Sequence, residues 1–276
     1  MGSYAMIEGY FIIMKLERKK MSTFSALNIL VIPDDQAKVE SLPENGWLLR
    51  LPSGAAGSYR VAQIDDYRRL PRHCFRWQPP LTLSLTAQVS AADLPGTWGF
   101  GFWNDPFTLS LGAKGSARRL PVLPNAAWFF HASPPNYLSL RDDLPASGLL
   151  AAVFRSPLIP SLLLAPALIG LPLLAVPAAA RCLRRIASSI IQQDTARLNV
   201  EVTRPHEYRL EWQPRFVRFY VDGEPLFETP LTPRGRLGLV IWIDNQYAAF
   251  TPEGRLGFGT LQNEASHLFV SKIHIE

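Results

Sequence analysis

The chain has 276 residues, of which 47% are hydrophobic and 18% are charged, and its formal net charge is +5. This composition supports a substantial core and excludes a disordered chain, while the mild basic excess permits an anionic partner without requiring one. The two cysteines, Cys74 and Cys182, fit no metal-binding spacing. We therefore expect no disulfide framework, metal or cofactor, and a cytoplasmic protein. The scattered arginines give no nucleic-acid signature.

The first 21 residues differ from the rest of the chain. Their apolar run, 10–14, is too short for the core of a signal peptide, and the basic residues follow it instead of preceding it. Residues 1–21 are therefore expected to be a poorly ordered N-terminal extension. Residues 22–276 are expected to form a single domain, because a β-sandwich of this length needs no division.

Short strands separated by turn residues dominate the chain from Trp47 onward. In 81–89, LTLSLTAQV, apolar residues alternate with polar ones, which predicts a strand with one buried face. Asp222-Gly223 is a strong hairpin turn because glycine adopts a positive φ without steric cost. Further strands are expected at 97–103, 206–212, 217–221, 236–243 and 268–275. This pattern predicts an all-β sandwich or barrel.

Residues 147–196 interrupt the strand pattern as an apolar, helical insertion. The stretch 156–180 carries no charge and is long enough to span a bilayer, but its five prolines make a straight transmembrane helix improbable. An amphipathic helix is expected at 181–194, with its arginines at the start. Two interpretations stay open. The insertion is either a hydrophobic lid on the sandwich or an element that docks on a membrane. In the second case, the residues expected at the bilayer are Leu163, Leu164, Ile169, Leu173, Leu174, Arg181, Arg184 and Arg185.

The segment 206–223, HEYRLEWQPRFVRFYVDG, resembles a hairpin of family 16 glycoside hydrolases that is usually written H-x-Y-x-x-x-W-T-P-x-x-I-x-F-Y-V-D-G. The aromatic segment 97–103, TWGFGFW, and the segments 236–245 and 268–275 resemble later parts of that family in the correct order. The resemblance implies a concanavalin A-like antiparallel β-sandwich, or jelly roll, with a carbohydrate-binding concave cleft.

The catalytic motif of that family, E-x-D-x-x-E, is absent from the chain. Retaining hydrolysis needs two carboxyl groups about 5 Å apart, and the strand expected to carry them, AAWFFHASPPNYLSL, contains no acid. No catalytic residue of the family can therefore be carried over, and whether any catalysis occurs stays open.

Two motifs, WNDP at 103–106 and WIDNQY at 242–247, each place an aromatic side chain beside an amide and an acid at a strand end. Aromatic rings stack on sugars, and amides and acids bind hydroxyl groups. The predicted ligand-binding residues are Trp103, Asn104, Tyr137, Trp242, Asn245 and Tyr247. The alternative is that the tryptophans belong to the core and the polar residues to turns.

Three functions remain open. The first is a protein that binds a carbohydrate or small amphiphilic ligand. Its insertion would either dock on the anionic surface of the inner membrane face or cover the cleft. The second is a divergent hydrolase or lyase in which His131 acts as acid or base with Asp105 or Asp244. The third is a structural or partner-binding module.

Overall fold

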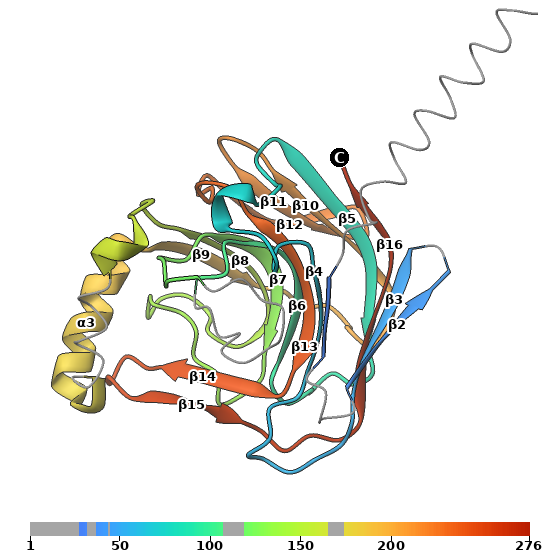
Figure 1. The fold of residues 1–276 in the computed structure, drawn as a ribbon, viewed down its shortest axis with the longest axis horizontal. Coiled ribbons are helices and arrows are strands. Elements are labelled where there is room, and N and C mark those ends of the chain that lie inside the picture. Colours follow the sequence, from blue (N-terminus) through green and yellow to red (C-terminus); the bar gives the residue numbers. More distant parts are fainter. Residues whose placement is uncertain (1–27, 32–36, 44, 107–118, 165–173) are drawn as a thin grey trace, which may run out of the picture.

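The computed structural model describes residues 28–31, 37–43, 45–106, 119–164 and 174–276. The expected extension, 1–21, lies outside these residues. Two seven-stranded sheets pack face to face, and every pairing within them is antiparallel. The all-β sandwich predicted from the strand pattern is thus confirmed (Figure 1).

Sheet A contains, in spatial order, β1 (Asn28–Val31), β4 (Val61–Asp65), β13 (Gly238–Asp244), β6 (Thr97–Trp103), β7 (Ala126–Ala132), β8 (Gly148–Arg155) and β9 (Gln192–Arg197). Sheet B contains β12 (Glu224–Thr229), β11 (Val217–Val221), β10 (His206–Trp212), β5 (Leu81–Val89), β16 (Ser266–Ile275), β3 (Gly46–Leu51) and β2 (Lys38–Leu42). A separate hairpin joins β14 (Gln246–Phe250) and β15 (Leu256–Thr260).

The core lies between the two sheets and follows from the alternation in the sequence. Every second residue of β5 is buried, as predicted for 81–89. The largest buried side chains of this core are aromatic and come from both sheets: Trp98, Phe100, Phe102, Phe129, Tyr208, Trp212 and Phe219. The Asp222-Gly223 turn joins β11 to β12 with a positive φ at both residues, 52° and 83°. This is the backbone twist that two-residue hairpins prefer.

The expected insertion at 147–196 is narrower in the structure. Its two ends are strands β8 and β9 of sheet A. The helix α3 (Pro177–Ile190) begins earlier and ends earlier than the predicted 181–194. Pro177 starts the helix because its fixed φ suits the first turn, and from Gln192 onward the chain pairs with β8 instead of continuing the helix.

Helix α3 lies beside the hairpin formed by β14 and β15 (Figure 1). Arg184 attaches it there: the buried guanidinium donates to the carbonyls of Ser139 and Phe250, at 2.6 and 2.7 Å, and pairs with Asp142 at 2.6 Å. The guanidinium also lies over the ring of Tyr137. Among the described residues, no helix is both long and apolar enough to cross a bilayer.

Candidate functional site

The face of sheet A that points away from sheet B is its concave face (Figure 1). The sheet register places large rings and very small residues side by side on this face. Trp103 lies opposite Ala126, Trp128 lies between Gly101 and Ala152, and Gly99 lies between Trp242 and Phe130. We call the five rings on this face the aromatic floor: Trp103, Trp128, Phe130, Phe154 and Trp242.

Glycine is required where the rings cross neighbouring strands. A Cβ added to Gly99 would lie 2.8 Å from the Trp242 ring and 2.4 Å from the carbonyl oxygen of Phe129. Gly101 has a φ of 152°, and an added Cβ would lie 2.6 Å from the Cβ of Trp128. The rings can therefore spread over β6 only because β6 reads T-W-G-F-G-F-W.

Trp128 is the centre of the aromatic floor. Its ring centroid lies 5.6 Å from those of Trp103 and Phe130 and 5.5 Å from that of Trp242. Trp103 and Trp128 keep part of their surface exposed, whereas Phe130 and Trp242 are 6% and 8% exposed. The Nε1 of Trp128 is buried and has no hydrogen-bond partner among the described residues, so a ligand meets the ring of Trp128 and not its donor.

The segment 66–75 covers one side of the aromatic floor. Tyr67 and Phe75 are buried in the same apolar cluster as Phe130 and Trp242. Arg119 fixes this segment, because it donates to three of its carbonyls, lies 5.6 Å from the Tyr67 ring centroid and forms an ion pair with Asp105. The exposed part of the floor therefore lies around Trp103 and Trp128.

Asp244 lies at one end of the floor and is hydrogen-bonded within the protein. The hydroxyl of Thr97 donates to it at 2.8 Å and that of Tyr59 at 3.3 Å, while the indole of Trp242 donates to Thr97. Burial raises the pKa of Asp244 to about 6, and these hydrogen bonds offset only part of that cost. The network holds Trp242 in position.

His131 does not belong to the concave face. Its ring stacks on Trp98, with centroids 5.5 Å apart, inside the sandwich, and burial lowers the pKa of His131 to about 4. Trp103, Trp242 and Asp244 are on the other face of the sheet, because neighbouring residues of a strand point to opposite sides. The expected pairing of His131 with Asp105 or Asp244 therefore needs correction: the described contacts of both carboxylates lie elsewhere.

The polar residues predicted in the two motifs are engaged in local structure. Asn104 binds the carbonyl of Leu123 and the amide of Asn125, and Asp105, with a φ of 48°, pairs with Arg119. Asn245 is fully buried and bonds to Ser58, Arg60 and Leu261. These three residues directly follow strands β6 and β13, and their described side-chain contacts are within the protein.

Two predicted aromatic residues lie on the hairpin side of the concave face. The backbone of Tyr137 bridges to β14, and its ring lies 5.3 Å from the Arg184 guanidinium. Tyr247, on β14, contacts the backbone positions of Gly257 and Gly259 on β15. Both are partly exposed, but no described contact joins either to the aromatic floor.

The motif analysis missed Trp128, Phe130 and Phe154. Their signal was present in the sequence, since alternation in AAWFFHA places Trp128 and Phe130 on the face opposite His131. The motif analysis chose His131 because it can titrate, but His131 lies on the face of β7 that points into the sandwich.

The described residues hold no group of three or more His, Cys, Asp or Glu side chains that could bind a metal ion. The fold is an antiparallel sandwich of two seven-stranded sheets. No family model matches the chain, and no curated protein matches it.

Solved structures show distant similarity to the chain. A β-glucanase from Bacillus licheniformis is 9% identical, with a TM-score of 0.45 and 90% of each chain covered. Rv0315 of Mycobacterium tuberculosis, described as a pseudo β-1,3-glucanase, is 13% identical, with a TM-score of 0.46, 86% of this chain covered and 77% of that one. A sialidase is 10% identical, with a TM-score of 0.42; 93% of this chain is covered but only 17% of the sialidase. Similarity at this level concerns architecture and says nothing about a ligand.

Proposed function

We propose that this protein is a non-catalytic carbohydrate-binding β-sandwich whose ligand lies on the exposed part of the aromatic floor. The observation that carries the proposal is strand β7, which lies next to the central strand β6 of the concave face. It presents Trp128 and Phe130 there, flanked by Ala126 and Ala132, and no acid. Flat apolar rings contact the C–H faces of sugars and of other partly apolar small ligands.

The distribution of carboxylates argues against glycoside hydrolysis. The strands of sheet A present Asp65 and Asp244 on the concave face, and the register separates them by four residues along β13. Four residues span roughly 13 Å at 3.3 Å per residue. Known glycosidase pairs are about 5 to 9.5 Å apart, so these two acids do not form one. Asp65 is also paired with Arg68.

Replacing Trp128 tests the proposal directly. We expect Trp128→Ala to weaken binding of soluble β-1,3- and β-1,4-linked glucose oligosaccharides by about tenfold in isothermal titration calorimetry, because it removes an aromatic contact. Trp128→Phe keeps a ring in the cluster, so it should weaken binding less.

Phe258→Ala is the matched control, since Phe258 is an aromatic residue on β15 that is 76% exposed and outside the floor. It should bind the oligosaccharides as the unchanged protein does. Equal losses in Trp128→Ala and Phe258→Ala, or no binding of any oligosaccharide at millimolar concentration, would sink the carbohydrate proposal.

We further propose that the apolar insertion docks on an anionic membrane, as expected for a cytoplasmic protein at the inner membrane face. Large apolar side chains there are exposed to solvent: Leu158 at 64%, Leu162 at 74%, Leu163 at 69% and Val176 at 53%. An exposed apolar group of this kind marks an interaction surface.

The predicted docking residues differ in their exposure to solvent. Leu163, Arg181 and Arg185 are exposed, and Leu164 and Leu174 are partly exposed. Arg184 is buried in its internal contacts and has no role at a bilayer. Ile169 and Leu173 lie outside the described residues. Exposed leucines and exposed arginines within one insertion fit the chemistry of an interfacial contact with anionic lipid.

The double substitution Leu162→Ser and Leu163→Ser tests docking. We expect it to reduce flotation with phosphatidylserine-containing vesicles at least about fivefold, because each lost leucine removes a hydrophobic contribution of roughly 1.5 kcal/mol or more when buried. The control is Leu226→Ser, on the edge strand β12, where the side chain is 40% exposed. If the double variant floats like the control, the insertion does not dock.

A further inference from the structure

A row of basic residues crosses the outer face of sheet B. The register pairs Lys38 of β2 with Arg50 of β3, and Arg50 with His267 of β16. Residues that are directly opposite share one face of a sheet, so the three side chains lie in line. Leu49 and Leu51, on either side of Arg50, point into the core, which fixes Arg50 on the outer face.

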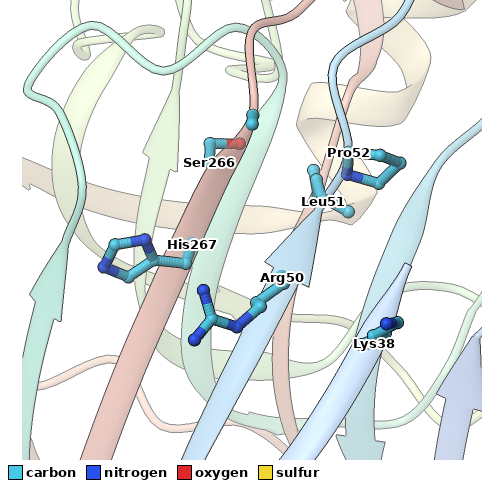
Figure 2. A pocket seen from close by; sticks show the side chains of 7 residues that line it. Lys38, Arg50, Leu51, Pro52, Ser266 and His267 are labelled. Carbon is cyan, nitrogen blue, oxygen red and sulfur yellow. The ribbon is translucent and has the colours of Figure 1, made fainter. Parts of the chain in front are cut away.

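These three side chains border a hollow of about 270 Å³, which Leu51, Pro52, Ala265 and Ser266 also line. Figure 2 shows the guanidinium of Arg50 beside the ring of His267, with Pro52 at the end of β3. The row thus has space in front of it that a small group can enter.

The charges of the row are only partly compensated. Glu40 lies 3.5 Å from Arg50, and both side chains are about half exposed. Among the described residues, no acid forms an ion pair with Lys38 or His267. Lys38 and Arg50 carry like charges directly opposite each other on β2 and β3, which destabilises a sheet, so an anion here would offset their repulsion.

The surroundings of His267 all lower the pKa of its imidazole. Burial lowers the pKa of the imidazole, and the positive charge of Arg50 adds to this effect. The other charged group that lines the hollow is Lys38, and Glu40 lies beside Arg50. On the β5 side, Ser90 is uncharged and accepts a hydrogen bond from the backbone amide of His267. An anion in the hollow would counteract the repulsion between Arg50 and a protonated His267.

We propose that the hollow between Lys38, Arg50 and His267 binds an oxyanion group of the sulfate or phosphate type, distinct from the concave aromatic floor. Arg50 supplies a planar set of donors that suits two oxygens of such a group, and Lys38 supplies a point charge. The same group is carried by free anions, sulfated sugars and lipid headgroups.

Titration of the intact protein with inorganic sulfate tests the proposal, with the ring signals of His267 followed by NMR. We expect saturable shifts, a raised His267 pKa in the bound state, and tighter binding as the pH falls and His267 takes up a proton. Arg50→Gln should weaken sulfate binding by about tenfold, as expected for losing a hydrogen bond to a charged group.

Arg204→Gln is the matched control, because Arg204 is exposed, pairs with Glu201 and does not line the hollow. It makes the same change in net charge. Equal sulfate affinity in Arg50→Gln and Arg204→Gln, or no response of His267 to sulfate, overturns the proposal. Both variants should bind neutral oligosaccharides at the aromatic floor as the unchanged protein does, which separates this test from that of the carbohydrate proposal.

Two further probes identify the source of the oxyanion. Arg50-dependent binding of a sulfated oligosaccharide, more than tenfold tighter than inorganic sulfate, supports the site and assigns it to acidic sugars. Arg50-dependent sedimentation with phosphatidylglycerol vesicles supports the site and assigns it to lipid headgroups. Sulfated-sugar or vesicle binding that is unchanged in Arg50→Gln contradicts the assigned site.

Discussion

Replacing Arg184 with alanine is expected to release helix α3 and the β14–β15 hairpin from the sandwich and to cost about 2–4 kcal/mol, because two carbonyls lose a charged hydrogen-bond donor. The guanidinium joins helix α3 to two segments that are distant in sequence. Ser139 and Asp142 belong to one of them, and Phe250 belongs to the other. Alanine would leave the two carbonyls without this donor. Urea unfolding gives the loss in free energy, and amide hydrogen exchange shows whether it concentrates in 177–190 and 246–260.

The neighbouring substitution Arg185→Ala provides the control. Arg185 is exposed and lies on the same helix, so the change in helix propensity is the same while the internal contacts remain. Arg185→Ala should change the free energy of unfolding by less than about 0.5 kcal/mol. If the two variants unfold alike, Arg184 does not hold the helix in place.

The pH dependence of stability should contain opposing contributions from Asp244 and His131 in the same acidic range. Burial also raises the pKa of Asp66 to about 6, so Asp66 adds to the contribution of Asp244. Burial raises the pKa of Asp244 to about 6, so the folded protein holds a proton that the unfolded chain has already lost. This contribution to stability is present below pH 4 and is lost as the pH rises through 6. Burial lowers the pKa of His131 to about 4, so its contribution is present above pH 6.5 and is lost as the pH falls through 4. Each amounts to about 3 kcal/mol at 1.36 kcal/mol per pH unit.

Single substitutions separate the two contributions. Asp244→Asn keeps an oxygen for the Thr97 donors, and the Tyr59 hydroxyl can turn to accept from the new amide. We expect it to raise the free energy of unfolding at pH 7.5 by roughly 1–3 kcal/mol and to match the unchanged protein at pH 4. His131→Phe should preserve stacking on Trp98 and remove the loss at acidic pH.

Urea unfolding of both variants between pH 4 and 7.5 measures these slopes. A loss of stability in Asp244→Asn at pH 7.5 would show that the hydrogen bonds of the carboxylate outweigh its burial. Unchanged oligosaccharide binding by His131→Phe would agree with the position of His131 inside the sandwich, whereas loss of an activity without loss of folding would revive its catalytic role.

At the candidate site, the local sequence pattern predicts the strands but not which of their faces points into the core. The strands β6 and β7 were both predictable, and so was the alternation of their side chains. Which face of β7 meets the core could not be decided from β7 alone, because both of its faces are apolar or aromatic. The register against β6 decides it: Phe129 lies opposite Phe100, both inside the sandwich, and Trp128 lies opposite Gly101 on the concave face.

The insertion shows a second limit. Its prolines disfavour a long straight helix, and the described residues contain no helix long and apolar enough to cross a bilayer. The segment QQDTAR after α3 has no strong strand pattern of its own. It becomes β9 because the free edge of β8 offers backbone partners along its whole length. Arg184 likewise looked like part of an exposed basic group, and only the approach of Phe250 and Ser139 from elsewhere in the chain buries it.

The sequence by itself determined the strand segments, the Asp222-Gly223 turn and the antiparallel β-sandwich, because side-chain alternation and turn chemistry act over a few residues. It also determined the absence of the E-x-D-x-x-E motif. Only the tertiary structure decided that His131 lies in the core, that five rings spread over glycines on the concave face, and that Lys38, Arg50 and His267 fall into one row. The physical reason is that these arrangements depend on register between strands far apart in the chain, which hydrogen bonding and core packing fix together.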